Sequence, residues 1–172
     1  MVERHLVIDR LKFSYEGLFN AAELYQLISS YFFEKGWDWY EKTNDEQVTP
    51  GGKQVLIILE PWKNISDYYK LKVRINLLMT DVKEVEVEHE GQTIRTNQGI
   101  VHFTIDGFVI SDRKGKWTSG QKIWQWLFII VMEKYFYRNH LEKFSTWIKS
   151  DVEDLLYKIK TYLNTYKYTY QS

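Results

Sequence analysis

Cysteine is absent from this chain of 172 residues. Its absence excludes disulfide bonds, thiolate catalysis and zinc sites that use cysteine. Proline occurs only twice, at Pro50 and Pro61, and no segment rich in serine and glycine divides the chain. We therefore expect a single domain over residues 1–172.

An excess of charge of either sign is also missing. Lysine and arginine together number 23, as do aspartate and glutamate, so the formal net charge is zero. This balance disfavours a protein that binds nucleic acid through bulk positive charge, and no nucleic-acid partner is expected. The opening residues, MVERHLVIDRLKF, carry charges within every short apolar run. They do not read as a secretory signal, so a cytoplasmic location is expected.

Recognisable catalytic and metal-binding motifs are lacking as well. No pair of histidines has the spacing of ligands on a helix, and the chain contains no HExxH, GxSxG or P-loop motif. Four carboxylates lie near apolar strand segments and would be general-base candidates only if burial raised their pKa: Asp9, Asp38, Glu60 and Asp106. We therefore expect a non-catalytic protein with no catalytic residue, no metal ligand and no cofactor.

Aromatic residues, in contrast, are abundant. Seven Trp, thirteen Tyr and nine Phe make up 17% of the chain. Such side chains fill a core with few residues, and they also line ligand cavities and protein interfaces. Composition alone leaves both interpretations open.

The first third of the chain predicts a strand, a helix and a second strand. Residues 2–15 alternate in two different phases, which a bulge or bend near Asp9 would reconcile. A helix follows, with Gly36 just past its last turn, and its apolar stripe comprises Leu18, Ala21, Tyr25, Ile28 and Phe32. Residues 49–53 predict a turn, and the apolar run 55–59 predicts a strand buried on both faces.

The next segment predicts a hairpin with complementary charges. A three-residue loop at 79–81 would pair Arg74 with Glu86, Lys72 with Glu88 and Lys70 with Glu90. A second tight turn at 90–92 would place Val87 opposite Ile94 and Glu86 opposite Arg95. The strand over 100–111 then contains Asp106-Gly107, which we interpret as a bulge in one long strand rather than a hairpin turn.

Two helices are expected after this sheet. Thr118 and Gln121 have the spacing of a capping box that opens a helix over 120–138. It contains IWQWLFIIVMEKYFY (123–137), which is too short for a membrane span of roughly 20 residues. The final helix, over 141–168, carries an apolar stripe, namely Phe144, Ile148, Val152, Leu155, Ile159, Tyr162 and Tyr166.

These elements predict an α+β fold. A curved antiparallel sheet of about six or seven strands would pack against helices, with a long C-terminal helical hairpin or bent helix. Residues 141–172 would form an appended amphipathic helix and a short tail. This order of elements over residues 4–163 resembles the helix-grip fold of the START-like (SRPBCC) superfamily. The resemblance implies a hydrophobic cavity between the sheet and a long helix, and binding of a lipid or another apolar ligand.

The first functional hypothesis is non-catalytic binding of a hydrophobic small molecule or lipid between the sheet and the C-terminal helices. The aromatic residues expected to line that cavity are Trp39, Tyr69, Phe103, Trp124 and Phe128. The alternative is an interaction module, or a subunit of a larger assembly, that contacts a second copy of itself or another protein through residues 141–168. Peripheral membrane contact through the aromatic helices ranks third.

Overall fold

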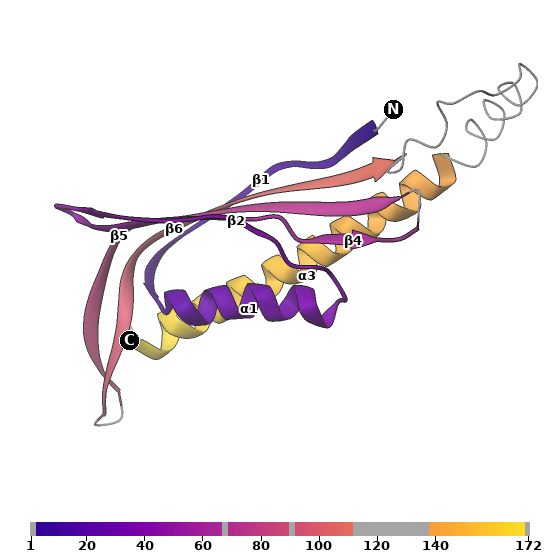
Figure 1. The fold of residues 1–172 in the computed structure, drawn as a ribbon. Coiled ribbons are helices and arrows are strands. Elements are labelled where there is room, and N and C mark those ends of the chain that lie inside the picture. Colours follow the sequence, from indigo (N-terminus) through magenta and orange to yellow (C-terminus); the bar gives the residue numbers. More distant parts are fainter. Residues whose placement is uncertain (1–2, 67–68, 90–91, 112–137, 171–172) are drawn as a thin grey trace, which may run out of the picture.

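The computed structural model describes residues 3–66, 69–89, 92–111 and 138–170. The fold is α+β, as predicted, with a curved, open antiparallel sheet and two helices on one side of it (Figure 1). The predicted helix over 120–138 lies outside the described residues, and so do Trp124 and Phe128. No helix among the described residues is both long enough and apolar enough to cross a membrane.

The sheet contains six strands and is flanked by one N-terminal and one C-terminal helix. In chain order the elements are β1 (Glu3–Phe19), α1 (Ala21–Glu34), β2 (Glu41–Thr49), β3 (Gly52–Leu59), β4 (Trp62–Asn64), β5 (Lys70–His89), β6 (Gln92–Ser111) and α3 (Arg138–Tyr170). The strand order is β1-β6-β5-β3-β2, and β4 pairs with β5 beyond the end of β3. The first strand of the chain therefore lies beside the last one.

The predicted irregularity near Asp9 is confirmed. Two register shifts interrupt the pairing of β1 with β6, one between Leu6 and Ile8 and one between Ile8 and Leu11. Arg10 adopts a φ of 46°, and its backbone N–H donates to Asp106 Oδ1 at 2.8 Å. The extra residues belong to β1, while β6 continues through Asp106 and Gly107 as a single strand.

The predicted hairpin loop at 79–81 is wrong. β5 runs without a turn from Lys70 to His89, because a register shift between Thr80 and Lys83 absorbs this region, where Asp81 has a φ of 55°. Arg74 therefore lies opposite Asp106 of β6 instead of Glu86. The second predicted turn has the expected register, since Val87 pairs with Ile94 and Glu86 with Arg95.

The two faces of the sheet differ in what covers them. The covered face packs against the helices, and its β5 residues, at most 2% exposed, are Leu71, Val73, Ile75, Leu77 and Met79. The open face carries the alternating residues Lys70, Lys72, Arg74 and Asn76, and no described helix lies over it (Figure 1). The strand predicted at 55–59 follows the same rule: Ile57 and Leu59 are buried, but Leu56 and Ile58 are half-buried on the open face. It is thus buried on one face only.

Helix α3 crosses the covered face along its apolar stripe. Its buried residues are Phe144, Ile148, Val152, Leu155, Ile159 and Leu163. It packs tightly on the sheet at Gly107, where an added Cβ would lie 2.8 Å from Ile148 Cγ2. The predicted stripe is confirmed from Phe144 to Ile159, and it packs against the chain's own sheet; Tyr162 and Tyr166 are only half-buried, and Leu163 takes the buried position near the end of the helix.

Candidate functional site

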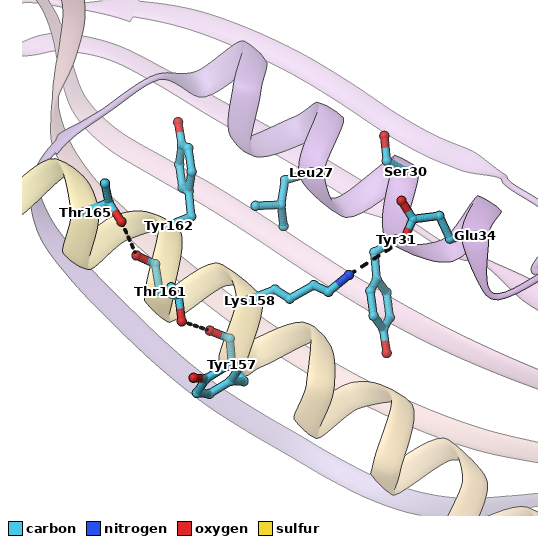
Figure 2. Close-up of a pocket in the computed structure, with 9 residues that line it drawn as sticks. All are labelled: Leu27, Ser30, Tyr31, Glu34, Tyr157, Lys158, Thr161, Tyr162 and Thr165. Carbon is cyan, nitrogen blue, oxygen red and sulfur yellow. Dashed lines mark hydrogen bonds and ion pairs between the residues drawn. The ribbon is translucent and has the colours of Figure 1, made fainter.

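A groove lies between α1 and α3, and residues of both helices line it. It has a volume of about 430 Å³ (Figure 2). We call it the α1–α3 groove, and its lining residues are Leu27, Ser30, Tyr31 and Glu34 of α1 with Tyr157, Lys158, Thr161, Tyr162 and Thr165 of α3. The lining segments of both helices span seven or eight residue steps, so the groove is about 12 Å long.

Hydrogen bonds at both ends of α1 fix the distance between the two helices. At the N-terminal end, Asn20 caps α1 by accepting from the backbone N–H groups of Ala22 and Glu23. The Tyr162 hydroxyl of α3 donates to Glu23 Oε2 at 3.0 Å. Toward the other end, the Tyr31 hydroxyl donates to the Asp151 carbonyl at 2.6 Å. The helices are therefore held side by side with the groove between these contacts.

The floor of the groove is apolar and its rim is polar. Leu27 is half-buried between the helices, and the Tyr31 ring is buried beneath the Lys158 ammonium, 5.0 Å from the ring centroid. Lys158 also pairs with Glu34 at 3.7 Å across the groove. This combination of an apolar surface with a few polar groups is typical of small-molecule sites.

The threonines on the α3 side contribute little polarity. Thr161 Oγ1 donates to the Tyr157 carbonyl and Thr165 Oγ1 to the Thr161 carbonyl, each at 2.9 Å. These bonds back to the preceding turn use the hydroxyl protons within the helix. The threonines therefore offer methyl groups and acceptor lone pairs to a ligand.

The buried tyrosines of the groove are neutral phenols at physiological pH. Burial raises the pKa of Tyr31 to about 12, and the negative charge of Asp151 adds to the effect. Burial also raises the pKa of Tyr162, and its hydrogen bonds with Tyr166 and Glu23 raise it further. A phenol that stays protonated can donate a hydrogen bond but cannot serve as a base at neutral pH. The tyrosines therefore suit binding better than proton transfer.

The three described residues among those predicted to line a ligand cavity lie in separate places. Trp39 is half-buried against α1, with its ring stacked on Phe33 at 6.1 Å. Tyr69 is buried against Phe144 near the start of α3, and Phe103 is buried beside Phe13 in the middle of the sheet. Phe103 pairs with Leu77, eight residues after Tyr69, which corresponds to about 26 Å along a strand. These residues do not meet in one small site, and none of them lines the α1–α3 groove.

Sequence reasoning assigned Tyr31, Tyr162 and Leu27 to no site. One signal was available, because Tyr157, Thr161 and Thr165 recur every four residues beside the apolar stripe of α3. Such a row marks one edge of a helix face. It could not reveal the groove by itself, since a groove also needs the position of α1.

None of the four carboxylates considered as general bases combines burial with a raised pKa. Asp9 and Asp38 are exposed, and Asp106 is half-buried. Glu60 is buried, and burial by itself would raise its pKa, but hydrogen bonds from Lys72 and Arg74 outweigh this effect and lower it. In the residues that the structure describes, no group of three or more acidic or histidine side chains could hold a metal ion.

The fold and the groove together define a class: an α+β protein whose sheet is covered on one face by two helices that form a shared groove. Comparisons of the chain with protein-family models, with curated proteins and with solved structures found no match. The function is therefore argued from the geometry of this molecule.

Proposed function

We propose that this protein is a non-catalytic binder of a small, largely apolar molecule, which it holds in the α1–α3 groove. The observation that carries the proposal is the groove itself. Its volume of about 430 Å³ lies within the range of roughly 300–1,000 Å³ that is typical of ligand pockets. The resemblance of the element order to the START-like superfamily also implies an apolar ligand, but it places the cavity between the sheet and the long helix, whereas the groove proposed here lies between the two helices.

The lining of the groove favours a flat or ring-containing ligand. The Tyr31 and Tyr162 side chains come from opposite helices and flank Leu27 (Figure 2). Tyr31 is 2% exposed beneath Lys158, so a ligand would contact chiefly the half-buried Leu27 and Tyr162 side chains, whose aliphatic and aromatic surfaces suit a planar apolar molecule. The length of about 12 Å also limits the ligand to a few fused rings or a short acyl segment.

The polar rim would orient the ligand rather than react with it. The Lys158–Glu34 ion pair lies across one end of the groove, and Ser30 lies on its edge. A hydroxyl or carbonyl group on the ligand would reach one of these residues. A ligand with one polar group and an apolar body therefore fits better than a strongly charged one.

Filling the groove tests the proposal. Ser30 is an exposed lining residue, so Ser30→Trp places an indole in the groove without removing a core side chain. We expect the wild-type protein to bind Nile red, a neutral apolar dye, saturably at one site per chain, and the S30W variant to lose this binding. The measurement is a fluorescence titration, after circular dichroism has shown that both proteins fold.

The matched control is Ala22→Trp. Ala22 is exposed on the same helix, about 12 Å from Ser30 along its axis, and does not line the groove. The A22W variant should bind the dye like the wild type. Equal loss in both variants, or no saturable binding by the wild type, would show that the groove is not a binding site.

A further inference from the structure

A second group of side chains, on the open face of the sheet, is unusual in its charge. Glu60 follows β3 directly, and its side chain is 7% exposed. Three cations surround its carboxylate: Lys72 Nζ at 2.6 Å, Arg74 Nε at 2.8 Å and Lys42 Nζ at 3.8 Å. We call these four residues the Glu60 cluster. One carboxylate faces three cations, so the cluster itself carries two uncompensated positive charges.

The surroundings of the cluster do not cancel this excess. Asp106 lies opposite Arg74 on β6, and its carboxylate accepts the backbone N–H of Arg10. Lys70, on the same face of β5, lies over the Trp62 ring at 3.8 Å from its centroid. Asp38, which bridges to Trp62 beside Lys72, is a second nearby carboxylate, so the surroundings lower the excess from two positive charges to one. The local charge therefore remains positive even though the whole chain is neutral.

Arg74 is held in an orientation that leaves donors available. Its guanidinium lies over the Phe108 ring, with Cζ 5.9 Å from the centroid, while Nε–H donates to Glu60. A guanidinium has five N–H donors, and in the described part of the chain Glu60 is the only carboxylate in an ion pair with Arg74. Its outer N–H groups form the planar fork that binds phosphate or carboxylate through two parallel hydrogen bonds.

We propose that Arg74, Lys72 and Lys42 form a binding site for a phosphate monoester on the open face of the sheet. All three cations lie within 4 Å of the Glu60 carboxylate, which gathers three positive charges at one place. Glu60 pre-orients Lys72 and Arg74 and lowers the excess of positive charge without removing it. Partial burial of Lys72 and Arg74 strengthens the attraction relative to fully exposed cations.

Phosphate titrations followed by NMR test this site. With chloride keeping the ionic strength constant, we expect inorganic phosphate and glycerol 3-phosphate to shift the backbone amide resonances of residues 72–76 saturably, a signal that the wild type and every variant share. Arg74→Gln should weaken the affinity about ten- to a hundredfold, because it removes charge-assisted hydrogen bonds. Glu60→Gln should tighten binding, since it removes the competing negative charge.

The matched control is Arg95→Gln, which removes an equal charge from an exposed ion pair with Glu86. It should leave the phosphate affinity within twofold of the wild type. Saturable shifts that Arg95→Gln weakens as much as Arg74→Gln does would mean a diffuse surface effect and would overturn the proposal. So would an absence of saturable shifts in the wild type.

A second experiment distinguishes whether the phosphate group belongs to a lipid or to a soluble molecule. Co-sedimentation with phosphatidylcholine vesicles that contain phosphatidic acid asks whether the group belongs to a lipid. Binding to these vesicles that Arg74→Gln abolishes supports a lipid headgroup. Binding of glycerol 3-phosphate without vesicle binding supports a soluble phosphate ester. Failure of both arms would overturn the proposal while leaving the α1–α3 groove untouched, because the dye titration tests that groove independently.

Discussion

Successive residues of β5 enter two different environments. Val73 and Ile75 point to the covered face and are fully buried beneath the helices. Lys72 and Arg74 point to the open face and remain 24% and 34% exposed. All four residues lie on the same strand, paired with β6 on one side, so the difference in exposure follows from which face each side chain points to.

The comparison indicates that the covered face stabilises the fold, while the open face keeps charged groups accessible for binding. Burial of a large apolar side chain contributes about 1.5–3 kcal/mol, so the covered face supplies most of the stabilisation. The open face keeps charged groups in contact with water, where an ion pair contributes at most about 1 kcal/mol unless it is buried. Glu60 is the exception on that face, because it is buried and contacts three cations.

Two phenylalanines of β6 provide the strongest test of this difference. Phe103 is 1% exposed on the covered face, and Phe108 is half-buried on the open face beneath Arg74. We expect Phe103→Ala to lower the free energy of unfolding by about 3–5 kcal/mol, because it leaves a cavity in the core. Phe108→Ala should cost about 1–2 kcal/mol, since less of its surface is removed from water. Urea denaturation measures both values, and equal costs would break the comparison.

The Glu60 cluster should give a smaller but distinct effect. Glu60→Gln weakens the contacts to Lys72 and Arg74, and we expect a loss of about 1.5–3 kcal/mol, as for hydrogen bonds to charged groups. The control is Glu86→Gln, which disrupts an exposed pair with Arg95 and should cost less than about 1 kcal/mol. If E60Q lowers the free energy of unfolding no more than E86Q does, Glu60 does not stabilise the fold more than an exposed ion pair.

The smallest expected effect is the change with pH in the stabilisation that the Glu60 carboxylate contributes. Contacts with Lys72 and Arg74 lower the pKa of Glu60 below its ordinary value of 4.5. A group whose pKa is lowered by folding contributes stability above that ordinary value and loses it as the pH falls through the folded pKa. The difference in unfolding free energy between wild type and E60Q should therefore be constant from pH 6 to 8 and shrink below pH 4.5. A difference that grows on acidification would contradict this account.

Local patterns in the sequence predicted much of the fold. The change of phase near Asp9 indicated the bulge in β1, and the complementary pattern around 90–92 predicted the register of Glu86 with Arg95. The spacing of apolar residues predicted the buried face of α3. Each of these features depends on residues close together in the chain, where periodicity is informative.

The charge pattern of residues 70–90 misled because it fits two arrangements. A basic row followed by an acidic row pairs well in a hairpin, but it fits equally well along one long strand that has other partners. In the structure the basic row meets Glu60 and Asp106, which come from β3's end and from β6. Cross-strand charge rules describe which pairs are favourable, and they do not specify which strand supplies the partner.

The sequence could not predict the groove either, again because the residues that form it are far apart in the chain. It depends on the spacing between α1 and α3, whose lining residues are more than 120 positions apart in the sequence. Hydrogen bonds from Tyr31 and Tyr162 set that spacing, and no local pattern links these tyrosines to their partners. Trp39, Tyr69 and Phe103, chosen from the sequence for their aromatic side chains, lie outside the groove, because composition does not specify position.

Chemical-shift mapping of a neutral apolar probe tests the central claim most directly. With indole titrated into the 15N-labelled protein, the account predicts saturable shifts concentrated in residues 27–34 and 157–165, which line the α1–α3 groove. Shifts concentrated on the open face of the sheet, or spread evenly over the surface, would contradict it.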